Sequence, residues 1–164
     1  MMTDEKIFEI VLHGRGGQGA ITAGLVLCEI AYKDGYKDVL SIPKIGAERR
    51  GAPIKAFVKL SRNRRIKNFA APEDQDFTII FDPSLIPLPG VADDVKHGTV
   101  LINTNREVDI SHFPDGCKIY TVPVTNISLD MNLTAAGYPI INIPLLGAFT
   151  QVKYLQDGDE RSLE

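Results

Sequence analysis

Apolar residues recur along the chain with two periods, and the alternation of these periods predicts strands and helices in turn. The run over 7–12 is typical of a buried strand, and apolar residues over 20–31 recur at helical spacing. Further runs predict strands at 37–42, 54–60, 77–81, 99–103 and 119–124. This order predicts an α/β fold: a Rossmann-like open sheet, mostly parallel, with helices on both faces.

The ends of several elements are set by glycine, proline and capping residues. The first helix is expected over 17–34, with Gly35 in the left-handed conformation after its end. Strand 54–60 alternates lysine with apolar residues, which predicts a wetter face and a place near a sheet edge. Later helices are expected over 91–96, from an Asn126 cap to 136 with Gly137 as its stop, and over 141–155.

One stretch stands out for its chemistry, the loop between the first strand and the first helix. Gly14, Gly16 and Gly19 fit the spacing G-x-G-x-x-G, and such a loop presents backbone N–H groups and a helix N-terminus to an anion. Arg15 is placed to add a charge-assisted contact. The candidate anion-binding residues here are Gly14, Arg15, Gly16, Gly17, Gln18 and Gly19.

Two alternatives to phosphate binding stay open for this loop. Glycines at a strand-to-helix turn also serve close packing of the helix on the sheet. Nicotinamide binding is disfavoured because the second strand ends in Ser41-Ile42-Pro43, without the acidic residue that holds a ribose.

A second shaped loop follows the second strand, where open α/β sheets place their ligands. It reads Gly46-Ala47-Glu48-Arg49-Arg50-Gly51-Ala52-Pro53, and its arginines are suited to gripping carboxylates or phosphates. The candidate residues are Glu48, Arg49, Arg50 and Gly51, with a solvated charged turn as the alternative. Because both loops emerge beyond the carboxyl edge of the sheet, we expect them to share one surface.

Composition narrows the function further. The 164 residues fit one domain over 1–164, and no apolar run or leader pattern indicates a membrane span or export, so we expect a cytoplasmic protein. Residues 1–70 carry a net charge of +6 and residues 71–164 carry −9, which favours a partner or an anionic ligand. No nucleic-acid motif is present. Two distant cysteines are too few for an iron–sulfur cluster.

Five blocks of sequence together resemble the gamma subunit of the 2-oxoacid:ferredoxin oxidoreductases, in particular the pyruvate type. The blocks cover residues 13–20, 46–53, 81–85, 101–104 and 142–148. The resemblance implies a Rossmann-like subunit that is not catalytic alone and that binds the alpha, beta and delta subunits, with ferredoxin reached through the complex. The whole enzyme converts a 2-oxoacid and coenzyme A to acyl-CoA, carbon dioxide and reduced ferredoxin.

The same resemblance implies that thiamine diphosphate and iron–sulfur clusters lie on other subunits, with no cofactor assigned to this chain. Its glycine loop and its Glu48–Gly51 loop would then face the subunit junction or the phosphates of coenzyme A. Ala47 to Pro53 resembles pyruvate-type chains, although branched-chain 2-oxoacids stay open. A free-standing nucleotide-binding module and a regulatory scaffold are the competing hypotheses.

Overall fold

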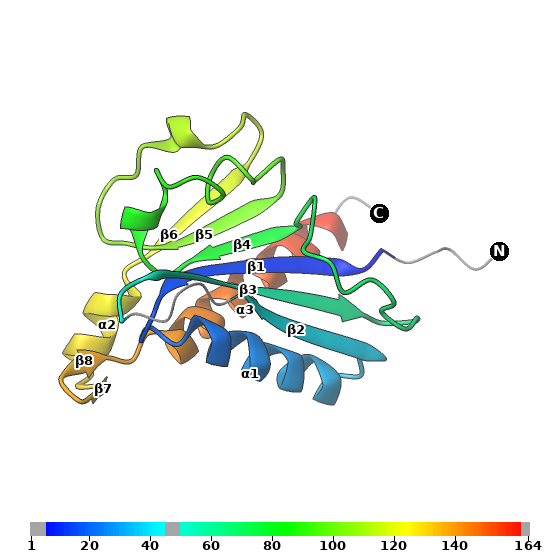
Figure 1. The fold of residues 1–164 in the computed structure, drawn as a ribbon, viewed down its shortest axis with the longest axis horizontal. Coiled ribbons are helices and arrows are strands. Elements are labelled where there is room, and N and C mark those ends of the chain that lie inside the picture. Colours follow the sequence, from blue (N-terminus) through cyan, green and yellow to red (C-terminus); the bar gives the residue numbers. More distant parts are fainter. Residues whose placement is uncertain (1–5, 45–49, 162–164) are drawn as a thin grey trace.

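The computed structural model describes residues 6–44 and 50–161, with side chains described up to Lys153. Within these residues six strands form one sheet, in the order β2-β3-β1-β4-β5-β6 (Figure 1). The strands are β1 (Phe8–Arg15), β2 (Asp38–Lys44), β3 (Pro53–Ser61), β4 (Phe77–Ile80), β5 (Thr99–Asn103) and β6 (Lys118–Val122). The α-helices are α1 (Ala20–Lys33), α2 (Val124–Asp130) and α3 (Asn142–Arg161).

The sheet is mixed because β3 runs against its neighbours. It pairs antiparallel with both β1 and β2, whereas β1, β4, β5 and β6 pair in parallel. The α/β class and the mostly parallel sheet are therefore confirmed, and strand 54–60 lies near the sheet edge as expected, next to the edge strand β2. β3 is not itself an edge strand, because it pairs with β1 on one side and with β2 on the other.

Lys59 shows that the lysine-bearing face of β3 is not exposed to solvent along its whole length. Its side chain is buried, and its ammonium lies 2.8 Å from the Glu9 carboxylate on β1, directly opposite in the register. A buried lysine is tolerated when a carboxylate neutralises it. The face that the sequence predicts as wetter is therefore closed by an ion pair at this position.

The prediction of helices on both faces of the sheet is wrong. Helices α1 and α3 pack in one core on the same face, with side chains such as Leu12, Ile79 and Leu145. On the other face no α-helix of the described chain covers the sheet. Loops that carry the 3₁₀ turns Pro83–Leu85 and Ile110–His112 lie there, at the upper left of Figure 1, and supply Leu85, Val91 and Phe113 to a second core.

Element boundaries differ from expectation mainly after residue 90. Helix α1 starts later than expected, and Gly35 follows it with φ +91°, as predicted. Residues 91–96 form turns, because Val91 and Val95 reach the second core without a regular helix. Helix α2 ends at Asp130, and Gly137 turns a short hairpin between β7 (Thr134–Ala135) and β8 (Tyr138–Pro139).

The carboxyl ends of the parallel strands meet at the left of Figure 1, where α2 and the β7–β8 hairpin also lie. The buried Ser128 hydroxyl donates to the Ile140 carbonyl at 2.7 Å and ties α2 to the chain after the hairpin. Both sequence motifs that carry candidate chemistry follow strands ending at this edge. None of the described helices combines the length and apolar character needed to cross a bilayer.

Candidate functional site

The glycine loop is shaped by close packing as much as by turning. Gly19 precedes α1 with φ +80°, and a β-carbon there would lie 2.7 Å from the Asn142 side-chain nitrogen. A β-carbon on Gly14 would lie 2.9 Å from that of Ala20. Real β-carbons do not approach other atoms so closely, so these two glycines let α1 sit tightly between β1 and the start of α3.

The two motif loops are hydrogen-bonded to each other. The Gly16 N–H donates to the Ala52 carbonyl at 2.9 Å, and the Gly51 N–H donates to the Gly16 carbonyl at 3.2 Å. For the described part of the second loop, from Arg50 on, the expectation that the two loops share one surface is confirmed. Glu48 and Arg49 of the second loop lie outside the described residues.

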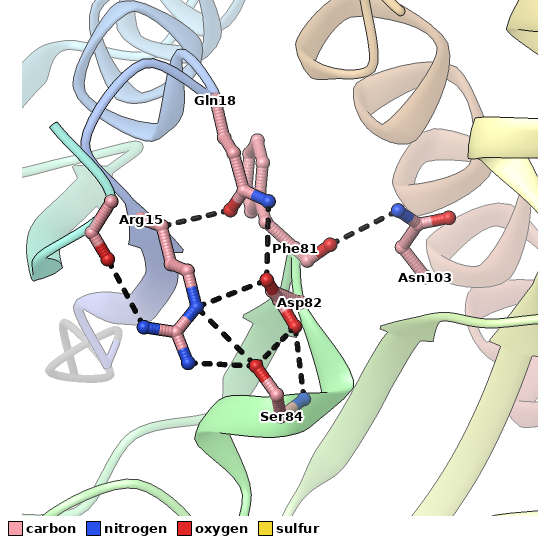
Figure 2. A network of polar contacts seen from close by, with 7 residues as sticks. Arg15, Gln18, Phe81, Asp82, Ser84 and Asn103 are labelled. Atoms are coloured by element: carbon pink, nitrogen blue, oxygen red, sulfur yellow. Dashed lines mark hydrogen bonds and ion pairs between the residues drawn. The ribbon is translucent and has the colours of Figure 1, made fainter.

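Arg15 joins three segments of the chain through its guanidinium, as Figure 2 shows. It donates to the Gly51 carbonyl at 3.0 Å, to the Ser84 hydroxyl at 2.7 Å, and through Nε to the Asp82 carboxylate at 3.1 Å. These bonds use several of its donors in a fixed fork. The side chain therefore holds the glycine loop, the second loop and the end of β4 in one arrangement.

Asp82 is the acceptor at the centre of this network. Burial works against its ionisation, but hydrogen bonds from Ser84 and the Arg15 guanidinium outweigh that effect and hold the pKa of Asp82 below its ordinary value. Its other neighbour is Gln18, whose amide donates to it at 3.4 Å. The carboxylate is thus ionised at neutral pH and complements Arg15.

Several loop N–H groups are already used inside the protein. The Arg15 N–H donates to the Gln18 side-chain oxygen at 2.8 Å, and the Gln18 N–H donates to the Arg15 carbonyl at 3.0 Å. With Gly16 bonded to Ala52, these groups do not point at a ligand. The arrangement differs from a loop whose amides converge on a phosphate.

A polar cleft of about 340 Å³ opens beside the network, at the carboxyl ends of β4 and β5. Asn103 at the end of β5 donates to the Phe81 carbonyl and to the Thr125 hydroxyl, and it accepts from the Thr125 N–H. These bonds fix the base of the cleft. Its lining includes Gln18, Asp82, Asn103, Thr104, Arg106 and Thr125.

Sequence reasoning did not single out Asp82, Ser84, Asn103 or Thr125 as site residues. The available signal was position: Asp82-Pro83-Ser84 comes directly after the predicted buried strand 77–81, and Asn103 ends the buried strand 99–103. The order of strands in the sheet decides which strand ends are neighbours, and the sequence does not contain that order.

Arg50 connects the second loop to an apolar surface. Its guanidinium lies 4.3 Å from the centre of the Tyr138 ring, within the range of a cation–π contact. Seven large apolar side chains from α2 to the start of α3, Tyr138 among them, are each between 37% and 64% exposed. We name this surface the 127–143 patch; it consists of Ile127, Leu129, Met131, Leu133, Tyr138, Ile140 and Ile143.

The two cysteines do not fit a shared metal cluster. Cys28 packs in the core beneath α1, and Cys117 packs against the core on the opposite face of the sheet. Burial raises the pKa of the Cys28 thiol to about 11, which disfavours the thiolate that metals bind. Among the described residues no group of three His, Cys, Asp or Glu side chains is placed to hold a metal.

Comparison with known proteins agrees with this architecture. A family profile described as "Pyruvate ferredoxin/flavodoxin oxidoreductase" matches residues 9–162. The chain is 38% identical over 148 residues to pyruvate synthase subunit PorC of Methanocaldococcus jannaschii, covering 89% of this chain and 77% of that one. It is 36% identical over 148 residues to the pyruvate/ketoisovalerate oxidoreductases common subunit gamma of Pyrococcus furiosus, covering 87% and 76%.

Solved structures share the fold. The pyruvate oxidoreductase subunit PORC of Thermotoga maritima superimposes with a TM-score of 0.75 at 32% identity, covering 90% of this chain and 77% of that one. The 2-oxoglutarate:ferredoxin oxidoreductase of Magnetococcus marinus has the same fold at 20% identity and a TM-score of 0.63. The match spans 79% of this chain and 22% of that longer one. This chain belongs to the pyruvate ferredoxin/flavodoxin oxidoreductase family and is a gamma subunit of that family.

Proposed function

We propose that this gamma subunit works in a complex that converts pyruvate and coenzyme A to acetyl-CoA and carbon dioxide, with ferredoxin as electron acceptor. The main support for this proposal is the family match over residues 9–162. The relative from Methanocaldococcus jannaschii is a pyruvate synthase subunit. The one from Pyrococcus furiosus is shared with a ketoisovalerate enzyme, which supports a branched-chain 2-oxoacid as a second substrate.

The 127–143 patch is the proposed contact with the subunits that carry thiamine diphosphate. An exposed apolar surface of several large side chains is typical of protein interfaces. The Arg50–Tyr138 contact places the second loop against this patch, so both belong to one junction. Alpha, beta and delta subunits are the proposed partners, and the chain acts as a single domain over 1–164 in the cytoplasm.

Of the two roles proposed for the motif loops, their hydrogen bonding favours the subunit junction. Arg15 is engaged by Asp82, Ser84 and Gly51, and the Gly16 N–H is engaged by Ala52. A phosphate at the loop would have to replace these bonds, whereas a partner subunit needs only the rigid surface that they create.

Coenzyme A is assigned instead to the polar cleft beside the loops. The exposed Arg106 supplies a positive charge for a phosphate, and the Thr125 hydroxyl, which accepts from Asn103, still has its own proton to donate. The Asp82 carboxylate, which also lines the cleft, repels anions, so we expect the phosphates to face Arg106. The Magnetococcus marinus structure of the same fold contains coenzyme A.

Kinetics of the assembled complex test this assignment. Arg106→Gln removes a charged hydrogen bond worth about 1.5–3 kcal/mol, so the KM for coenzyme A should rise about tenfold or more. The rate at saturating coenzyme A and the KM for pyruvate should stay unchanged. Arg65→Gln, at an exposed arginine on another loop, is the matched control.

An unchanged KM for coenzyme A in Arg106→Gln would contradict the cleft assignment. The wider proposal is tested by leaving this chain out of the co-expression. A complex that keeps full pyruvate-dependent reduction of a viologen dye without this chain would contradict the function itself.

A further inference from the structure

A second cleft lies on the sheet face that no described α-helix covers, and its base is a histidine that the loop network does not use. We name it the His13 cleft; it has a volume of about 400 Å³ and is lined mainly by His13, Ile54, Lys55, Leu85, Leu88 and Val91. Among the residues that the structure describes, it shares no lining residue with the polar cleft. A ligand here is therefore separate from the proposed coenzyme A site.

His13 is buried at 2% exposure, and within the described part of the chain its Nε2 has no hydrogen-bond partner. Such an atom is costly to bury, because it has lost its hydrogen bond to water and gained none in exchange. A group entering the cleft would restore the missing bond. Buried polar atoms without partners are rare in native proteins, so a molecule that supplied a partner here would stabilise the site.

Lys55 on β3 lies opposite His13 on β1. The two residues are direct partners in the antiparallel pairing of β1 and β3, so their side chains share one face of the sheet. Burial, together with the Lys55 charge and against the opposing Asp93 charge, lowers the pKa of His13 to about 3. The imidazole is therefore neutral, and in its Nε2–H tautomer it presents a donor next to the Lys55 ammonium.

The acidic residues near the cleft are held by other groups. Asp93 accepts the N–H groups of Gly90 and Val91 at 2.6 and 3.1 Å. Asp94 lies 3.4 Å from the Lys55 ammonium and is exposed, so a ligand anion can replace it there. Lys44 adds a second positive charge to the lining. His13, Lys44 and Lys55 therefore line a cleft whose other described lining residues are apolar. The Lys55 ammonium, which also donates to the Gly90 carbonyl, keeps a donor for an anion.

We propose that the His13 cleft binds a small carboxylate with an apolar tail. The carboxylate accepts hydrogen bonds from His13 Nε2–H and the Lys55 ammonium, and the tail packs against Leu85, Leu88 and Val91. Apolar walls alone would accept any small hydrophobic molecule; the paired donors select an anion. The inference rests on this cleft and not on the proposed function.

The test uses the full chain with hexanoate as the probe and NMR of ¹⁵N-labelled histidine side chains as the readout. Hexanoate should shift the His13 ring resonances saturably and leave those of His97 and His112 unchanged. Hexan-1-ol and hexylammonium have the same tail without the carboxylate, and each should bind at least about tenfold more weakly because a charged hydrogen bond is lost.

Two variants separate the anion contact from the apolar contact. Lys55→Met should weaken hexanoate binding about tenfold or more, with Lys67→Met at an exposed lysine as the matched control. Leu88→Trp fills the cleft without removing a charge and should abolish binding. Unchanged circular dichroism and urea midpoints identify folded variants. Absence of a His13 shift at tens of millimolar hexanoate, or equal binding of hexan-1-ol, would overturn the proposal.

Discussion

The Asn142 side chain lies so close to Gly19 that a β-carbon on Gly19 would be 2.7 Å from its nitrogen. The contact joins the start of α3 to the start of α1, two elements that are far apart in the sequence. Gly19 also has φ +80°, which disfavours any side chain. The close contact with Asn142 and the positive φ both oppose the replacement of Gly19 by a residue with a side chain.

We expect Gly19→Ala to destabilise the chain by about 2–4 kcal/mol, from backbone strain and from the clash with Asn142. Gly35→Ala is the control for strain alone, since Gly35 has φ +91° and open space around it, and it should cost about 1–2 kcal/mol. Urea unfolding measures both. Equal losses in the two variants would show that the contact with Asn142 is easily relieved.

Arg15→Lys should loosen the junction of the two loops while keeping the charge. Lysine lacks the fork that reaches Gly51, Asp82 and Ser84 together, so the free energy of unfolding should fall by about 1–3 kcal/mol. Assembly with the partner subunits, followed by size-exclusion chromatography, should weaken in parallel. Arg65→Lys should change neither quantity. If Arg15→Lys kept wild-type stability and assembly, the guanidinium hydrogen bonds of Arg15 would contribute to neither.

His13 should make stability depend on pH. Its pKa is about 3 in the folded chain and about 6.5 when unfolded, so below pH 6.5 the unfolded chain takes up a proton that the folded chain refuses. Stability contributed by the neutral imidazole is complete above pH 6.5 and is lost as pH falls toward 3, by about 1 kcal/mol per pH unit.

His13→Gln tests this dependence through urea unfolding at pH 7 and pH 5. The loss of stability between the two pH values should be smaller in the variant by about 1–2 kcal/mol, whatever its stability at pH 7. His112→Gln, at an exposed imidazole, should keep the wild-type loss. The same loss in His13→Gln as in the wild type would mean that His13 is protonated in the folded chain at pH 5.

A substitution in the 127–143 patch should weaken assembly with the partner subunits without changing the stability of the folded chain. Met131 is 64% exposed, so Met131→Asp should leave the urea midpoint within about 0.5 kcal/mol of wild type while reducing affinity for the partner subunits about tenfold or more. Leu25→Asp on α1 is the control, because Leu25 is 57% exposed and lies outside the patch. Pull-down of the complex from co-expressing cells, quantified by titration, measures the difference. Normal assembly of Met131→Asp would place the interface elsewhere.

Local pattern was enough to predict most elements up to β5. The run before Gly14 and the helical spacing after it identify β1 and α1, and Gly35 marks the end of that helix because it supplies a positive φ. The resemblance of five sequence blocks led to the gamma subunit family, which the relatives confirm. These features are local or carried by motifs, and they do not depend on which strands become neighbours.

Only the tertiary structure decided which strands are neighbours and which distant side chains are in contact. It put β3 between β1 and β2, gave Lys59 its partner Glu9, and brought Asp82 to Arg15. It also left one sheet face to loops, which created the cleft over His13. By itself the sequence determined the elements, the two motif loops and the family; strand order and side-chain partners followed only from folding, because burial and neutralisation are properties of contacts between distant segments.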